Sequence, residues 1–176
     1  IADLEAEEKN VLDVASCCGF EFDPGLVASA LGQARVPVLQ SLARIEKRHR
    51  LVRAVGRRFA FDHHQVQEAL YGALPEMLRE EYHAALASTL ETRAKCADKD
   101  PTTLDGALCV DLCEHFLKGA QGERALRYLD AALTHLEKGY LNEAAIRIAE
   151  RALAAPGLLA GAERGKVLLR LAARLD

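Results

Sequence analysis

Two neighbouring histidines, His63 and His64, are the residues of this chain whose position suggests chemistry. An imidazole at the start of a helix can contact a phosphate group together with the free N–H groups of the first helical turn. A nucleotide-sensing role is therefore one interpretation of this pair. The alternative is that His63 only caps or packs at the junction, and the sequence leaves both open.

The histidines lie where the pattern of the sequence changes from strand to helix. Residues 59–61 alternate as a half-buried strand does. A four-residue apolar spacing follows, typical of an amphipathic helix, at Val66, Leu70 and Leu74. Asp62 stands at the change of period, and Asp is a favourable N-cap. The sequence therefore predicts a helix from about His63 to Leu74, with Asp62 as its N-cap.

A basic cluster just before this junction is the second feature with a plausible function. Between residues 44 and 58, seven cations stand against the single carboxylate of Glu46, namely Arg44, Lys47, Arg48, Arg50, Arg53, Arg57 and Arg58. Such a cluster can neutralise the phosphates of duplex DNA, or it can meet an acidic protein surface. A plain solvated face is the third interpretation.

Other motifs give no catalytic site. Gly161-x-x-x-Gly165-Lys166 has too few residues between its glycines for a phosphate-binding loop and lacks the following Ser or Thr. The histidines elsewhere are scattered singly, and the five cysteines have no metal-ligand spacing. We therefore expect no enzymatic activity, no metal and no cofactor in this segment, and cysteines that are reduced, small apolar residues.

Composition places the chain among soluble globular proteins. Its 176 residues are 50% hydrophobic and 28% charged, with a net charge of −3. No apolar run reaches the roughly 20 residues of a membrane-spanning helix, and the acidic start, Ile1 to Glu8, is unlike a signal peptide. These features predict a cytoplasmic protein, and the missing initiator Met suggests a piece of a longer chain.

The first half predicts three helices followed by a β-hairpin, the order of a winged helix-turn-helix. Gly19 ends the first helix, Asp23-Pro24 starts the second, and the third runs from about Pro37 to Arg48. Residues 51–55 and 59–61 form the hairpin around Gly56-Arg57-Arg58. A short extended piece, Phe20 to Phe22, connects the first two helices. After Pro75 another helix runs to about Ala94.

The second half predicts helices alone. Residues 97–103 are the most linker-like, so we place one domain at 1–95 and another at 104–176, with a boundary slightly earlier in the long helix as the alternative. Ala-Leu or Ala-Ile pairs recur seven residues apart on successive helices. These small and large residues suit stacked α-hairpin repeats. The fold class is thus mainly α, a winged helix followed by a tetratricopeptide-like array, with Gly161–Asp176 as a further helix.

Two strings carry a family resemblance. Phe59-x-Phe61-x-His63-x-x-Val66-x-Glu68-Ala69-Leu70-Tyr71, continued by Leu74-Pro75, resembles the winged helix that follows the nucleotide domain in bacterial signal-transducing ATPases with numerous domains (STAND). The string His115-Phe116-Leu117-x-Gly119, with Glu123 and Ala125-Leu126 after it, is similar to the tetratricopeptide-type repeats of such proteins. The repeat string is shared by many scaffolds and is the less specific of the two.

The resemblance implies a function for the segment. It would couple an upstream nucleotide switch, which binds ADP or ATP, to a repeat array that binds a protein or a small inducer. In related switches a His at the position of His63, or of His64 if the register slips by one, contacts the β-phosphate of ADP. Here the residues that flank this His in the family motif are not kept. The basic cluster would then dock on a domain of the same protein.

A DNA-binding winged-helix regulator with a helical effector or dimerisation domain is the alternative. The output domain, the inducer and the oligomeric state are not determined by the sequence, nor is the choice of DNA or protein as partner of the basic cluster.

Overall fold

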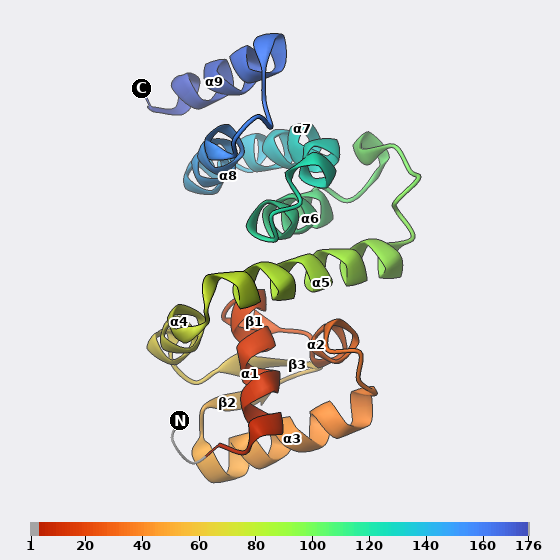
Figure 1. Cartoon of the computed structure of the whole chain (residues 1–176), viewed down its shortest axis with the longest axis vertical. Coiled ribbons are helices and arrows are strands. Elements are labelled where there is room, and N and C mark those ends of the chain that lie inside the picture. The colour runs from red at the N-terminus through yellow and green to blue at the C-terminus, as the bar shows by residue number, and fades with distance from the viewer. Residues whose placement is uncertain (1–3, 176) are drawn as a thin grey trace. The chain divides into compact units, whose positions relative to one another are not determined.

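The computed structural model describes residues 4–175, with the backbone alone for Leu175. The expectations that concern Ile1–Asp3 and Asp176 lie outside these residues. The chain forms two compact units that divide between Thr89 and Leu90. This division falls inside helix α5 (Glu76–Ala94), while the predicted domains 1–95 and 104–176 stay a prediction. The described residues are mainly helical, as expected, and contain one small sheet (Figure 1).

The first unit has the element order helix, strand, helix, helix, strand, strand, helix. Its elements before α5 are α1 (Ala6–Cys18), β1 (Glu21–Phe22), α2 (Pro24–Ala30), α3 (Arg35–His49), β2 (Val52–Val55), β3 (Arg58–Phe61) and α4 (His64–Ala73). Three helices followed by a hairpin were therefore predicted correctly. Gly19 ends α1 with a φ of 113°, and the carboxylate of Asp23 accepts a hydrogen bond from Gly25 at the start of α2.

The sheet is antiparallel in the order β1-β3-β2. The hairpin pairs Val55 with Arg58 around a two-residue turn whose Gly56 has a φ of 60°. The piece expected to be merely extended is strand β1, in which Phe22 pairs with Phe59. Sequence reasoning missed this strand because two residues are too few to show a period.

Phenylalanine rings from the sheet form one side of the core of this unit. The ring of Phe22 lies 5.4 Å from that of Phe61 and 6.2 Å from that of Phe59, centroid to centroid. The helices contribute fully buried apolar side chains, which include Val11, Leu12, Val27, Val38, Leu42 and Ile45. This burial holds α3 against α1 by one face and leaves its other face to solvent.

The N-cap of α4 differs from the prediction by one residue. His63 occupies the N-cap position in an extended conformation and makes no side-chain cap hydrogen bond. Asp62 lies one residue before the N-cap, directly after β3, where its N–H donates to the carbonyl of Leu51 at 2.9 Å. Its carboxylate instead contacts Nε2 of His63 at 3.2 Å. The predicted Asp62 cap is wrong.

The second unit consists of consecutive helices, and residues 104–175 contain no strand as far as they are described. After the C-terminal turn of α5 come a 3-10 helix η1 (Pro101–Thr103), α6 (Gly106–Lys118), α7 (Gly122–Lys138), α8 (Asn142–Ala154) and α9 (Gly161–Leu175). The four alanines at the predicted seven-residue spacing, Ala125, Ala132, Ala145 and Ala152, are buried, as is Leu133, whereas their large neighbours Leu126, Ile146 and Leu153 are partly exposed. Small residues at these positions let the helix axes approach closely.

The same turn occurs twice in this unit, twenty residues apart. Gly119 donates to the carbonyl of His115 at 2.8 Å, and Gly139 donates to that of His135 at 3.0 Å. The residue after each glycine adopts a left-handed conformation, with φ of 54° at Ala120 and 57° at Tyr140. The chain thus repeats one helix–turn unit, since α6–α7 and α7–α8 are joined identically.

Across the described part of the chain, no helix is both long enough and apolar enough to span a bilayer.

Candidate functional site

The basic cluster lies on the C-terminal half of α3 and on the β2–β3 hairpin, and three of its seven cations are paired within the first unit. Arg48 lies 3.8 Å from the carboxylate of Glu5, and Arg58 lies 2.8 Å from that of Glu21. These two contacts involve half-exposed side chains, and such surface pairs contribute little stability. Both cations therefore retain access to an external anion.

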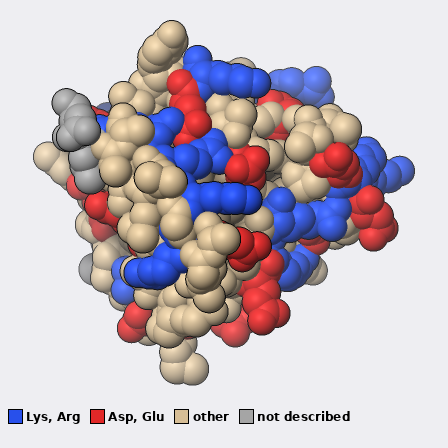
Figure 2. Space-filling model, turned by 90° about the horizontal axis from the view of Figure 1, so that it is seen from above, with Lys and Arg blue, Asp and Glu red and all other residues tan. Residues whose placement is uncertain are grey.

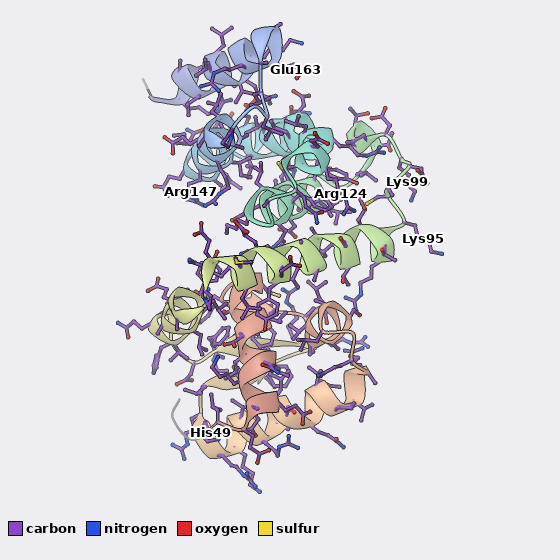
Figure 3. All side chains as sticks on the ribbon, in the orientation of Figure 1. His49, Lys95, Lys99, Arg124, Arg147 and Glu163 are labelled. Carbon is purple, nitrogen blue, oxygen red and sulfur yellow. The ribbon has the colours of Figure 1, made fainter. Side chains whose placement is uncertain are left out.

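Arg44 is held differently, because its partner Glu8 is buried. The carboxylate of Glu8, only 1% exposed, receives Nε of Arg44 at 3.3 Å and the N–H of Glu5 at 3.2 Å. Nε2 of His49 lies 3.7 Å away, at the end of α3 (Figure 3). Removing a partner from a buried carboxylate costs several kcal/mol. Arg44 is thus a structural residue that fixes α3 on α1.

The remaining four cations of the cluster, Lys47, Arg50, Arg53 and Arg57, are exposed and have no ion-pair partner among the described residues. Arg35, at the first position of α3, is exposed and unpaired in the same sense, and sequence reasoning missed it because it lies nine residues before Arg44. Residues 35–58 contain eight Lys or Arg and one Glu, a net charge of +7, so the rest of the chain carries −10.

The single carboxylate of this segment is engaged by backbone. Oε1 of Glu46 accepts a hydrogen bond from the N–H of Ala54 at 2.9 Å and so ties α3 to the edge strand β2. This bond positions the cations of α3 and those of the hairpin in one unit. On the face that Figure 2 views, blue and red side chains are interspersed.

His63 and His64 occupy different environments. The side chain of His63 is 71% exposed, with Asp62 as its partner. The ring of His64 stacks on Phe20 with centroids 3.9 Å apart, which links α4 to the segment before β1. Because α4 has no side-chain cap, the N–H groups of its first two residues, His64 and Gln65, stay open to a ligand, whereas that of Val66 donates to the carbonyl of His63 at 3.0 Å. His64 packs on Phe20 and His63 is exposed beside Asp62, and the sensing role of this pair stays a prediction.

A shallow apolar groove lies between α7 and α9 in the second unit. It has a volume of about 220 Å³ and is lined by Leu126, Leu129, Leu133, Leu159 and Val167 together with the charged Asp130, Glu163, Lys166 and Arg170. Glu163 lies near the start of α9 (Figure 3). The guanidinium of Arg170 hydrogen-bonds Glu137, Asp130 and Thr134 of α7. These bonds attach α9 to α7.

Buried ionisable groups in this unit are arranged for stability. Burial raises the pKa of Tyr128, whose hydroxyl donates to Glu91 at 2.7 Å, and raises the pKa of Cys113 to about 12. A thiol with so high a pKa is not a nucleophile at neutral pH. All five cysteines are free, and the described residues hold no group of His, Cys, Asp and Glu that could bind a metal ion.

Comparisons with protein-family models, with curated proteins and with solved structures find no match to this chain.

Proposed function

We propose that this chain is a non-catalytic regulatory segment of a signal-transducing ATPase, in which the first unit is a winged helix and the second a tetratricopeptide-like array. The order of elements in the first unit, with strands arranged β1-β3-β2, supports the winged helix. The identical turns at Gly119 and Gly139 support a helical repeat. Resemblance of the His63 and His115 strings to that family supplies the link to a nucleotide switch.

The observation that carries the proposal is the exposed His63, which contacts Asp62, at the start of α4, where no side chain caps the helix. In the proposed mechanism His63 donates a hydrogen bond to the β-phosphate of ADP held by an upstream nucleotide domain, and the first N–H groups of α4 add to this contact. The basic cluster docks on that domain and keeps it inactive. A protein or small inducer bound to the helical array releases it.

Replacing His63 by Ala in the protein that joins this chain to its nucleotide domain tests the proposal. We expect faster ADP release and activity without inducer, because one charge-assisted hydrogen bond is lost. His64→Ala is the matched control, since His64 stacks on Phe20. ADP release that is unchanged in His63→Ala, with circular dichroism showing an intact fold, would exclude the sensing role.

A DNA-binding regulator is the second candidate, and one observation favours it. The +7 charge of residues 35–58 is concentrated on α3 and the following hairpin, the two elements with which a winged helix meets DNA. The second unit would then serve as effector or dimerisation domain.

A further inference from the structure

The solvent face of α3 carries uncharged side chains along most of its length. Val36, Gln40 and Ala43 are exposed at helical spacing, Val36 to 63%, and the exposed Lys47 follows them on the same face. The opposite face, which includes Val38, Leu42 and Ile45, is buried in the core of the first unit. The exposed face therefore forms a ridge on a helix that packs on the core from behind.

Cations stand at both ends of this ridge. Arg35 lies at the N-terminal end, where Ala34 offers no side-chain cap and the N–H groups of Arg35 and Val36 are the open donors, since Pro37 has no N–H. Lys47 and Arg50 lie at the other end. The hairpin adds Arg53, exposed on β2, and Arg57, exposed in the turn. The arrangement places positive charge at either side of a strip of uncharged, short side chains.

We propose that this ridge of α3 enters the major groove of duplex DNA and reads its base edges. Gln40 would hydrogen-bond adenine through N6 and N7, and Val36 and Ala43 would contact thymine methyl groups. The flanking cations and the N-terminus of α3 would bind phosphates and fix the register. This inference rests on the second candidate function and adds to it a sequence preference for A·T pairs.

The composition of the ridge favours DNA over an acidic protein. Protein interfaces depend on large anchors, above all Trp, Tyr and Arg, in a desolvated centre, whereas the centre of this ridge holds only Gln40 and Ala43. The one carboxylate of the segment, Glu46, is turned to the backbone of Ala54. Glu5 and Glu21, at the margins, are already paired with Arg48 and Arg58.

Binding to a 20-base-pair duplex of random sequence, followed by fluorescence anisotropy from 50 to 300 mM salt, tests the phosphate contacts. Five cations, Arg35, Lys47, Arg50, Arg53 and Arg57, predict a slope of log K against log salt of about −4.5. The double variant Arg53→Ala/Arg57→Ala should reduce this slope by about 2 and weaken binding roughly 60-fold at 0.1 M salt. The variant Lys138→Ala/Lys166→Ala, two exposed lysines of the second unit, is the matched control.

Selection from a pool of random duplexes tests the base contacts. We expect enrichment of A·T pairs and, for Gln40→Ala, a loss of roughly 5- to 150-fold in preference for the selected site, with affinity for the random duplex unchanged. Binding without enrichment, or with enrichment that Gln40→Ala does not alter, overturns the inference and leaves the second candidate function intact. No binding at 50 mM salt overturns both, and docking on an acidic protein then accounts for the cations.

Discussion

At the scale of single residues, His115 shows how burial turns a side chain into a pH-sensitive element. Burial, with a smaller effect of the nearby Lys118, lowers the pKa of His115 to about 4, although Glu114 acts in the opposite direction. The folded protein therefore holds this imidazole neutral where an unfolded chain would protonate it, since the ordinary value is 6.5.

The sign of the resulting pH dependence follows from proton uptake. Above pH 6.5 neither state binds the proton, and between pH 6.5 and about 4 only the unfolded chain does. The free energy of unfolding should therefore fall by up to about 3 kcal/mol as the pH drops through this range, and then level off. Urea denaturation at a series of pH values measures this decrease in the free energy of unfolding.

His135, which occupies the equivalent position twenty residues after His115, provides the control for this effect. His115→Gln should flatten the pH profile between 4 and 6.5, whereas His135→Gln, at an exposed site, should leave it unchanged. A wild-type profile that His115→Gln does not alter would assign the acid sensitivity to other groups.

At the scale of elements, the repeated helix–turn unit places a non-glycine residue in the left-handed region. Ala120 has a φ of 54° immediately after Gly119, whose own φ is −88°. A left-handed conformation costs a residue with a Cβ roughly 1–2 kcal/mol. The glycine that ends each helix in the sequence is thus not the residue that adopts the unusual backbone angle.

Ala120→Gly should consequently stabilise the protein. We expect a gain of about 0.5–1 kcal/mol in the free energy of unfolding, because the steric cost exceeds the extra chain entropy of glycine. The same replacement at Ala172, exposed inside α9, should instead destabilise by about 1 kcal/mol. Urea denaturation measures both variants. If the two urea midpoints shift in the same direction, the left-handed angle of Ala120 does not cost the folded protein stability.

At the scale of the whole molecule, charge is segregated. Residues 35–58 carry +7 and the remaining residues −10. Molecules with such asymmetry attract one another when the segment of one meets the acidic surface of the next, and salt screens this attraction beyond the Debye length, about 10 Å at 0.1 M.

We therefore expect a negative second virial coefficient in static light scattering at about 20 mM salt, which becomes positive above roughly 0.3 M. The double variant Arg53→Ala/Arg57→Ala should weaken the low-salt attraction, and Lys138→Ala/Lys166→Ala, which removes charge elsewhere, should not. A coefficient that is positive and independent of salt in the wild type would show that the segregated charges do not meet.

Local sequence patterns determined the helices, the hairpin and the charged segment of this protein. Apolar spacing predicted the helices, because each period is a property of a few successive residues. Gly56 and the alternation around it predicted the hairpin. The basic cluster followed from composition alone, whereas the position of His63 at the start of a helix followed from the change of period at Asp62. A twenty-residue repeat of His-x-x-Lys-Gly at His115 and His135 was also present in the sequence and could have predicted the two identical turns.

Only the tertiary structure decided which of these residues remain open to a partner. Glu8 binds Arg44 and Glu21 binds Arg58, which lie 36 and 37 positions further along the chain. The local periodicity of a sequence does not indicate such distant pairs. Strand β1 exists because β3 offers it hydrogen bonds, and Asp62 stays bonded to Leu51 at the end of the hairpin while α4 begins after it, with His63 at the N-cap. Each outcome depends on a contact between distant segments, whose free energy exceeds the weak local preference of the residues concerned.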